Sequence, residues 1–208
     1  YVIASESSAV DTLDGDLVRD VKPGELVVLD SDGGGFESYQ LIEPKNTAHC
    51  FFEHVYFARP DSRIDGSLVY DVRRELGRSL WNESGIDTDV VMPVPDSGRA
   101  FASGYAEAAS NDEGDAKVEF AEGLMKNRYV GRTFIMPTQE ERERAVRLKL
   151  NPIRDVVEGQ SVTLIDDSIV RGTTSRQLVS LLRDVGAEEI HVRIGSPAIV
   201  APCYLGID

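Results

Sequence analysis

The chain has 208 residues, 41% of them hydrophobic and 28% charged, which is enough to bury a full core. Its formal net charge of −14 argues against non-specific binding to nucleic acids or to anionic membranes, because both of these carry negative charge themselves. The sequence has no run of 18 apolar residues and no signal-peptide pattern, so we expect a cytoplasmic protein without a membrane partner.

The first 45 residues predict strands and turns that lack a core of their own. A short apolar run at 26–29 follows the Pro23-Gly24 turn and leads into a triple-glycine loop. We therefore expect the main part of this domain to precede Tyr1. The chain also stops at Asp208 directly after an apolar stretch, so both ends are expected to be cut from something longer.

From residue 50 onward, stretches with strand and helix character alternate along the chain. Strands are expected at 50–58, 87–94, 162–165 and 189–195. Helices are expected at 66–80, 97–109 and 175–185, and a charged, helix-competent stretch at 139–148. Such an alternation predicts an α/β fold with a mainly parallel sheet flanked by helices.

The most informative segment follows the apolar strand that ends at Ile165. Asp166 and Asp167 come first, then a short loop with Gly172, then a hydroxyl-rich helix start. Free backbone N–H groups and the positive end of a helix dipole attract phosphate, and a glycine lets the backbone come close. The carboxylates can accept hydrogen bonds from sugar hydroxyls. The pattern predicts a sugar-phosphate site, although an acid pair before a helix can also be a cap with a solvated carboxylate.

Two further observations narrow the chemistry. Neither Gly-x-x-x-x-Gly-Lys nor Gly-x-Gly-x-x-Gly occurs, so the common nucleotide-phosphate motifs are absent. The Pro-Asp-Ser-Gly turn at 95–98 and the acid-pair loop both follow predicted parallel strands, where ligands of such sheets bind. An anionic substrate of so acidic a chain needs local basic groups. The candidates are Arg128, Arg132, Arg142, Arg144, Arg147 and Lys149.

The acid-pair segment is similar to the phosphoribosyl pyrophosphate (PRPP) signature of type I phosphoribosyltransferases. Other stretches make the resemblance more specific: Phe-Ala-Arg-Pro-Asp-Ser at 57–62, Pro-Val-Pro-Asp-Ser-Gly at 93–98, Lys-Asn-Arg-Tyr-Val-Gly-Arg-Thr-Phe-Ile at 126–135 and Gly-Ser-Pro at 195–197. Together they resemble the amidophosphoribosyltransferase family from Ala48 onward. Residues 5–7 and 19–25 look like the tail of that family's glutaminase domain.

The resemblance implies two domains and one reaction. Residues 1–45 would be the β-rich tail of an N-terminal-nucleophile glutaminase domain, and 46–208 a truncated domain of the type I phosphoribosyltransferase fold. The family is a pentosyltransferase that opens purine synthesis. It makes 5-phosphoribosylamine, pyrophosphate and glutamate from PRPP, glutamine and water, with ammonia able to replace glutamine.

The same resemblance implies roles for individual residues. Magnesium would be held by Ser97, Asp166 and Asp167, and the loop at 171–175 would hold the 5-phosphate. The implied substrate-binding residues are Asp166, Asp167, Ser168, Arg171, Gly172, Thr173, Thr174, Ser175, Lys126 and Arg132. The basic stretch at 126–149 would close over the site, unless its 139–148 part is only a solvated surface helix.

The two cysteines allow two readings. Cysteines in a cytoplasmic chain are usually buried thiols rather than disulfides. Cys50 and Cys203 nevertheless match ligands of a structural 4Fe–4S cluster in one branch of the family. Such a cluster needs four thiolates, so the other two would lie beyond Asp208, and an assembled cluster is not expected in this chain.

The chain departs from the family at its start. The glutaminase nucleophile is an N-terminal cysteine, but residue 1 is Tyr, so we expect no glutamine hydrolysis by this chain as given. The family also implies purine nucleotide inhibitors and a homo-oligomer. The alternatives are a salvage phosphoribosyltransferase acting on a base, a PRPP-sensing regulator without turnover and, with less support, a PRPP-synthesising kinase.

Overall fold

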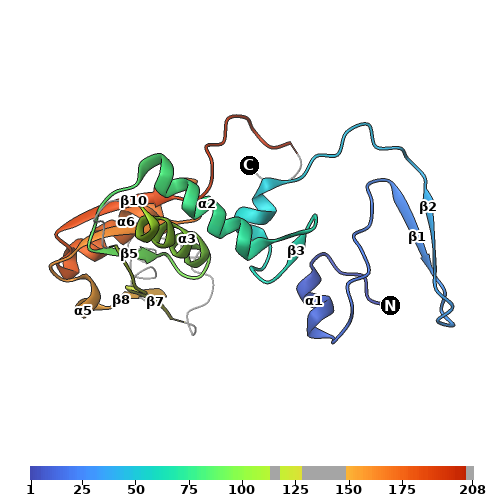
Figure 1. The fold of residues 1–208 in the computed structure, drawn as a ribbon, viewed down its shortest axis with the longest axis horizontal. Helices are drawn as coiled ribbons and strands as arrows, with labels where there is room; N and C mark the ends of the chain where they lie inside the picture. The colour runs from blue at the N-terminus through green and yellow to red at the C-terminus, as the bar shows by residue number, and fades with distance from the viewer. Residues whose placement is uncertain (113–117, 128–148, 205–208) are drawn as a thin grey trace, which may run out of the picture. The chain divides into compact units, whose positions relative to one another are not determined.

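The computed structural model describes residues 1–112, 118–127 and 149–204, which form two compact units, Tyr1–Val72 and Arg73–Asp208 (Figure 1). The boundary between the units falls inside helix α2 (Val69–Ser84). The predicted domain boundary between residues 45 and 46 stays a prediction. Within the part of the chain so described, no helix is long and apolar enough to cross a membrane.

The first unit opens with a short helix, α1 (Ser7–Thr12), and an antiparallel hairpin of β1 (Glu25–Leu29) and β2 (Phe36–Gln40). The expectation of strands and turns alone was wrong for α1, because six residues are too few to establish helical periodicity in the sequence. Large hydrophobic residues on both strands stay close to half exposed, among them Leu26, Val28, Phe36 and Tyr39. The hairpin therefore buries little apolar surface within its own unit.

The aromatic run at 50–58 is helical, so the strand predicted there is wrong. It contains the π-helix η1 (Glu53–Phe57), preceded by one helical turn at Phe51 and Phe52. A continuous apolar run does not reveal its period, and here helical winding brings the rings together. The ring centroid of Phe52 lies 5.6 Å from that of Tyr56 and 5.3 Å from that of Phe57.

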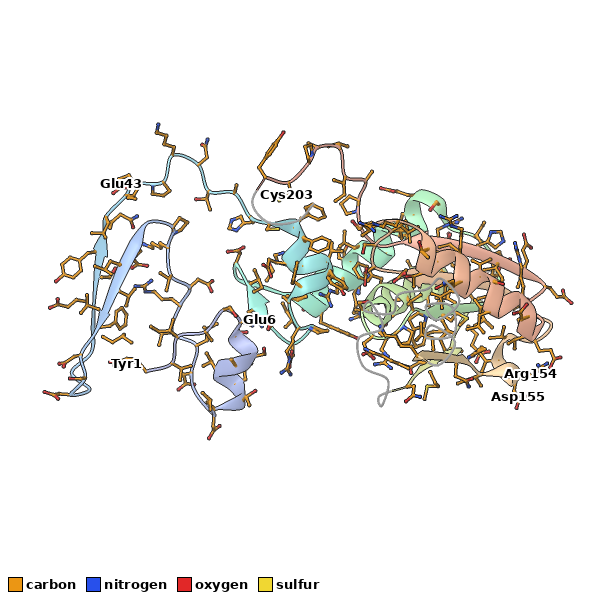
Figure 2. All side chains as sticks on the ribbon, turned by 180° about the vertical axis from the view of Figure 1, so that it is seen from behind. Tyr1, Glu6, Glu43, Arg154, Asp155 and Cys203 are labelled. Atoms are coloured by element: carbon orange, nitrogen blue, oxygen red, sulfur yellow. The ribbon has the colours of Figure 1, made fainter. Side chains whose placement is uncertain are left out.

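A two-stranded hairpin, β3 (Arg63–Ile64) and β4 (Ser67–Leu68), leads from η1 into α2. Glu6, just before α1, fixes this region to the start of the chain (Figure 2). Its carboxylate accepts hydrogen bonds from the backbone N–H of Arg59 and the hydroxyl of Ser62, both at 2.8 Å. Residues more than fifty positions apart in sequence are thus joined within the first unit.

The second unit is built on a four-stranded parallel sheet in the order β10-β9-β5-β6. The strands are β5 (Val90–Pro93), β6 (Glu119–Phe120), β9 (Ser161–Asp166) and β10 (Glu189–Ile194). The predicted α/β class with a mainly parallel sheet is confirmed. β5 and β9 are neighbours in register, with Pro93 opposite Ile165, so both end at the same edge of the sheet.

Helices cover both faces of this sheet. Val90, Met92 and Val94 point to one face and pack with Leu178 and Leu182 of α6 (Thr173–Val185). Pro93 points the other way, toward α3 (Gly98–Asn111). Because alternate residues of a strand face opposite sides, α3 and α6 lie on opposite faces of the sheet.

A further antiparallel pair of strands lies on the α6 side of the core. It consists of β7 (Leu124–Lys126) and β8 (Leu150–Pro152), and a short helix α5 (Arg154–Val157) follows. The N–H of Asn127 donates to the carbonyl oxygen of Lys149 at 2.8 Å and extends the pairing. The helix-competent stretch predicted at 139–148 lies outside the described residues.

The predicted helices and strands that the structure contains are those with a clear hydrophobic periodicity or a continuous buried apolar run. The helix expected at 97–109 is α3, the strand at 162–165 is β9, and the strand at 189–195 is β10. The helix expected from residue 66 begins at Val69 instead, because residues 63–68 form the β3–β4 hairpin. Helix α6 begins at Thr173, two residues earlier than expected, so Thr173 and Thr174 belong to its first turn.

Candidate active site

The turn after β5 and the loop after β9 are joined by backbone contacts. The N–H of Val94 donates to the carbonyl oxygen of Ile165 at 2.8 Å, and the N–H of Gly98 donates to that of Val94 at 3.0 Å. Ser97 precedes the first residue of α3 at this point. The structure thus places Ser97 and the acid pair on neighbouring loops, as their positions after parallel strands predicted.

The third segment at this edge is the end of β10. The N–H of Gly195 donates to the carbonyl oxygen of Asp166 at 2.9 Å, and that of Ser196 donates to the carbonyl of Asp167 at 2.8 Å. A Cβ at residue 195 would lie 2.3 Å from a ring carbon of Phe101, so only glycine permits this approach. The backbone of the acid pair is therefore held between β5 and β10.

The two carboxylates differ in environment. Asp167 is only 4% exposed, and its carboxylate accepts a hydrogen bond from the hydroxyl of Ser168 at 2.5 Å. Asp166 accepts a hydrogen bond from the N–H of Asp167 at 3.0 Å. Burial and, secondly, the charge of Asp167 raise the pKa of Asp166 to about 7. Two adjacent carboxylates are therefore costly to ionise together without a cation.

The loop after the acid pair ends in a left-handed residue that starts helix α6. Gly172 has φ 67° and ψ 4°, a conformation that costs a residue with a Cβ about 1 kcal/mol or more. Its carbonyl accepts the first helical hydrogen bond, from the N–H of Arg176 at 3.1 Å. Thr173 and Thr174 are exposed beside this helix start. The predicted glycine turn into a helix is therefore present, while anion binding there stays a prediction.

Arg176 makes two hydrogen bonds that were not predicted from the sequence. Its guanidinium donates to the carbonyl oxygens of Gly172 at 3.3 Å and of Arg171 at 3.4 Å, and so holds the loop against the first turn of α6. Isoleucine and valine in this loop point outward, with Ile169 50% and Val170 79% exposed. The carbonyls of the loop are thus turned toward Arg176 and the helix.

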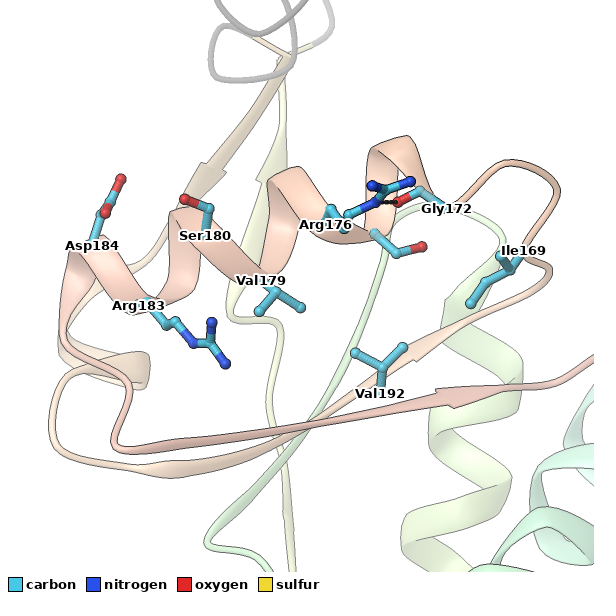
Figure 3. A pocket seen from close by; sticks show the side chains of 9 residues that line it. Ile169, Gly172, Arg176, Val179, Ser180, Arg183, Asp184 and Val192 are labelled. Atoms are coloured by element: carbon cyan, nitrogen blue, oxygen red, sulfur yellow. Dashed lines mark hydrogen bonds between the residues drawn. The ribbon is translucent and has the colours of Figure 1, made fainter.

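A surface pocket of about 540 Å³ lies beside this loop, between α6 and β10 (Figure 3). Gly172 and Ser175 line it, together with Val179 of α6 and Val192 of β10. Asp166 and Asp167 do not line it. The pocket therefore lies along the flank of α6 and is separate from the acid pair.

A chain of ion pairs lies beside the Ser97 turn. The ammonium of Lys126 is 2.5 Å from a carboxylate oxygen of Asp96, and Arg99 is 3.2 Å from the other oxygen. Arg99 also contacts Glu122 at 2.8 Å. Lys126 was predicted to bind substrate, whereas Asp96, Arg99 and Glu122 were not singled out. Arg99 could have been identified from the sequence, because it directly follows the Pro-Asp-Ser-Gly turn.

The structure does not test every predicted residue. Arg128, Arg132, Arg142, Arg144 and Arg147 lie outside the described residues. Cys50 and Cys203 are both exposed and belong to different units. Among the residues with described positions, no group of three or more His, Cys, Asp or Glu side chains could hold a metal ion by itself.

The chain is similar to known proteins over its whole length. It is 55% identical over 208 residues to an amidophosphoribosyltransferase of Methanothermobacter thermautotrophicus, covering 99% of this chain and 42% of that protein. The corresponding enzymes of Archaeoglobus fulgidus and Bacillus subtilis are 52% and 48% identical over the full chain, which covers 44% and 42% of them. No protein-family model matches the chain.

Solved structures agree with these relatives. One is described as glutamine PRPP amidotransferase from B. subtilis complexed with ADP and GMP, and another as the allosteric regulatory enzyme of purine biosynthesis. Both have a TM-score of 0.84 at 47% identity and match 96% of this chain, but only 42% and 41% of their own chains. The chain thus spans about two fifths of the relatives that it matches. Over that span, it is similar to the amidophosphoribosyltransferases.

Proposed function

We propose that the chain carries the phosphoribosyl-transfer site of an amidophosphoribosyltransferase, which acts on PRPP and releases pyrophosphate. One observation carries this proposal. The Ser97 turn and the acid-pair loop follow adjacent strands and lie next to each other, and each of these loops leads into a helix. A ligand that spans both loops needs an anionic group at each end and hydroxyls between them. PRPP has this layout.

The 5-phosphate binds at the start of α6. The exposed N–H groups and hydroxyls of Thr173 and Thr174 donate to phosphate oxygens, and the helix dipole favours the negative charge. Gly172 supplies the left-handed turn that opens this face of the backbone. Ser168 and Arg171 of the preceding loop and Ser175 of the first turn of α6 also bind this phosphate.

The acid pair takes the ribose hydroxyls and a magnesium ion. The raised pKa of Asp166 fits this role, because two neighbouring carboxylates with little exposure are stabilised by a cation between them and the anionic substrate. Ser97 supplies a third hard oxygen from the adjacent loop. Magnesium, when bound, neutralises the leaving pyrophosphate and so lowers the barrier to its departure.

The residues of this chain then align the reaction rather than perform proton transfer. Positive charge develops on the ribose as the bond to pyrophosphate lengthens, and the carboxylates of the acid pair stabilise it. Ammonia is already nucleophilic, so alignment and exclusion of water matter more than a strong base. Lys126 and Arg132 bind the pyrophosphate end.

Other properties are proposed for the whole protein. It uses ammonia released from glutamine, purine nucleotides inhibit it, and it works as a homo-oligomer in the cytoplasm. Residues 1–45 belong to its glutaminase domain. A B. subtilis relative was solved with ADP and GMP, which supports the nucleotide part. Cys50 and Cys203 are both exposed, and their thiolates would supply two of the four ligands that a 4Fe–4S cluster needs.

One assay tests the proposal. Pyrophosphate release is measured with PRPP and magnesium, and with ammonia, glutamine or purine and pyrimidine bases as the acceptor. We expect ammonia to stimulate release and bases to have no effect. Stimulation by a base instead of ammonia would identify a salvage phosphoribosyltransferase, and PRPP binding without release under any condition would identify a sensor.

A further inference from the structure

The carboxylate of Asp96 lies between two cations, and each of its oxygens contacts one of them. Oδ2 is 2.5 Å from Nζ of Lys126, and Oδ1 is 3.2 Å from Nη1 of Arg99. Arg99 turns its remaining edge to Glu122, with Nε 2.8 Å from a carboxylate oxygen. Lys126 and Arg99 thus each already contact a carboxylate.

The pair between Asp96 and Lys126 links two separate elements. Lys126 is the last residue of β7, while Asp96 stands in the turn after β5 and directly precedes Ser97. That turn is bonded to the end of β9 through Val94 and Ile165. The ammonium group of Lys126 is therefore held by a carboxylate at the edge of the sheet where the acid pair lies.

This ion pair is exposed enough for another anion to replace Asp96 at Lys126. The side chain of Lys126 is 38% exposed and that of Asp96 is 55% exposed. Exposed ion pairs contribute little to stability because solvent and salt screen them. A phosphate group carries more charge than one carboxylate and offers several acceptor oxygens, so it competes well for the same ammonium group.

We propose that Asp96 is a resident counter-anion for Lys126, which a phosphate group of the substrate displaces on binding. The inference rests on the proposed function, because that function makes Lys126 a ligand of the pyrophosphate end. In the empty site, Asp96 holds the ammonium group in place. On binding, Lys126 exchanges the carboxylate for phosphate oxygens, while Arg99 keeps Glu122.

The exchange also gives Asp96 a part in selectivity. An anionic ligand must replace Asp96 at the ammonium group of Lys126. Its gain in binding free energy is therefore only the difference between its own attraction to Lys126 and the attraction of Asp96 to Lys126. Monoanions gain almost nothing, whereas pyrophosphate groups gain a net interaction. The carboxylate of Asp96 thus lowers affinity for all anions but discriminates against those with a single charge.

The test is the affinity for magnesium pyrophosphate, measured by titration calorimetry on the wild-type protein and on Asp96→Asn. We expect the variant to bind about three- to fivefold more tightly, the size of an exposed ion pair that no longer competes. The gain disappears when the same change is made in a Lys126→Met background. It also shrinks at high salt, because salt screens exposed charges.

Glu158→Gln is the matched control. Glu158 is a similarly exposed carboxylate paired with an arginine, Arg154, but it stands just before the start of β9, at the opposite edge of the sheet. It removes the same charge, so we expect no change in affinity. Urea unfolding of all variants checks that the fold is intact.

Each remaining outcome counts against the exchange. Unchanged or weaker binding by Asp96→Asn, with normal binding by the wild type, overturns the role of Asp96 and leaves the proposed function in place. An equal gain in Glu158→Gln reduces the effect to net charge and also overturns it. If the wild type binds neither PRPP nor magnesium pyrophosphate, the proposed function fails as well.

Discussion

Gly98 lies against the carbonyl oxygen of Ile165, so closely that a Cβ at residue 98 would be 2.5 Å from that oxygen. Gly98 is the first residue of α3 and Ile165 directly precedes the acid pair. This close contact between Gly98 and Ile165 sets the distance between the two loops that we propose to bind substrate. It depends on the missing side chain, because no Cβ can be accommodated against backbone.

Gly98→Ala is therefore expected to damage both stability and binding. The added methyl group must push the start of α3 away from β9, at a cost of about 1–3 kcal/mol in the free energy of unfolding. Urea unfolding measures this cost, and calorimetry should show weaker PRPP binding in protein that remains folded. Unchanged stability and affinity would mean that the two loops are not held together here.

The left-handed turn at Gly172 gives a prediction with a matched control. Gly172 and Gly159 have φ of 67° and 73°, and neither would bring a Cβ within 4 Å of another group. An alanine at either position should therefore cost about 1 kcal/mol of stability through backbone strain alone. Only Gly172→Ala is expected to weaken PRPP binding, since Gly159 precedes β9 at the opposite edge of the sheet.

Equal losses of affinity in the two glycine variants would argue against a phosphate site at the start of α6. The comparison is informative because urea unfolding should give the two variants similar stability. Any difference in binding then reports the local role of the loop. Binding is measured with PRPP and magnesium by calorimetry.

Stability should depend on pH through Asp166. Its pKa is raised from 3.8 to about 7 in the folded protein, first by burial and then by the charge of Asp167. The folded state then binds a proton more tightly than the unfolded state, so the free energy of unfolding falls as pH rises from about 4 to about 7. The loss is at most on the order of 4 kcal/mol.

Asp166→Asn should remove this pH dependence. We expect the variant to be more stable than the wild type at pH 8 and similar to it at pH 4, as measured by urea unfolding across this range. Magnesium should stabilise the wild type at pH 8 and have little effect on the variant. A wild-type stability that rises between pH 4 and pH 7 would show that Asp166 is not the group in question.

The parts of the site that sequence predicted are those carried by local chemistry. An acid pair, a glycine and two threonines between a buried strand and a periodic helix predict a phosphate loop. In the structure this segment does lead from β9 through the turn at Gly172 into α6, and phosphate binding there stays a prediction. The neighbouring turn with Ser97 was also predicted, because the carboxyl ends of adjacent parallel strands meet at one edge.

The features that the sequence did not predict depend on contacts between distant residues or lie in segments without a clear hydrophobic pattern. The ion pair between Lys126 and Asp96 joins two elements thirty positions apart. The aromatic run around Phe52 has no readable period, so its helical winding was taken for a strand. The short strands β7 and β8 were missed because three residues show no alternation, although their pairing places Lys126 at the site.

The central claim is that Asp166 and Asp167 seat a phosphorylated pentose together with a divalent cation. Titration calorimetry with PRPP, with and without magnesium, tests it most directly on the wild type and on the double variant Asp166→Asn, Asp167→Asn. We predict magnesium-dependent binding by the wild type and a loss of at least about tenfold in the folded double variant. Equal affinity in the two proteins, or binding by the wild type that is indifferent to magnesium, would contradict the account.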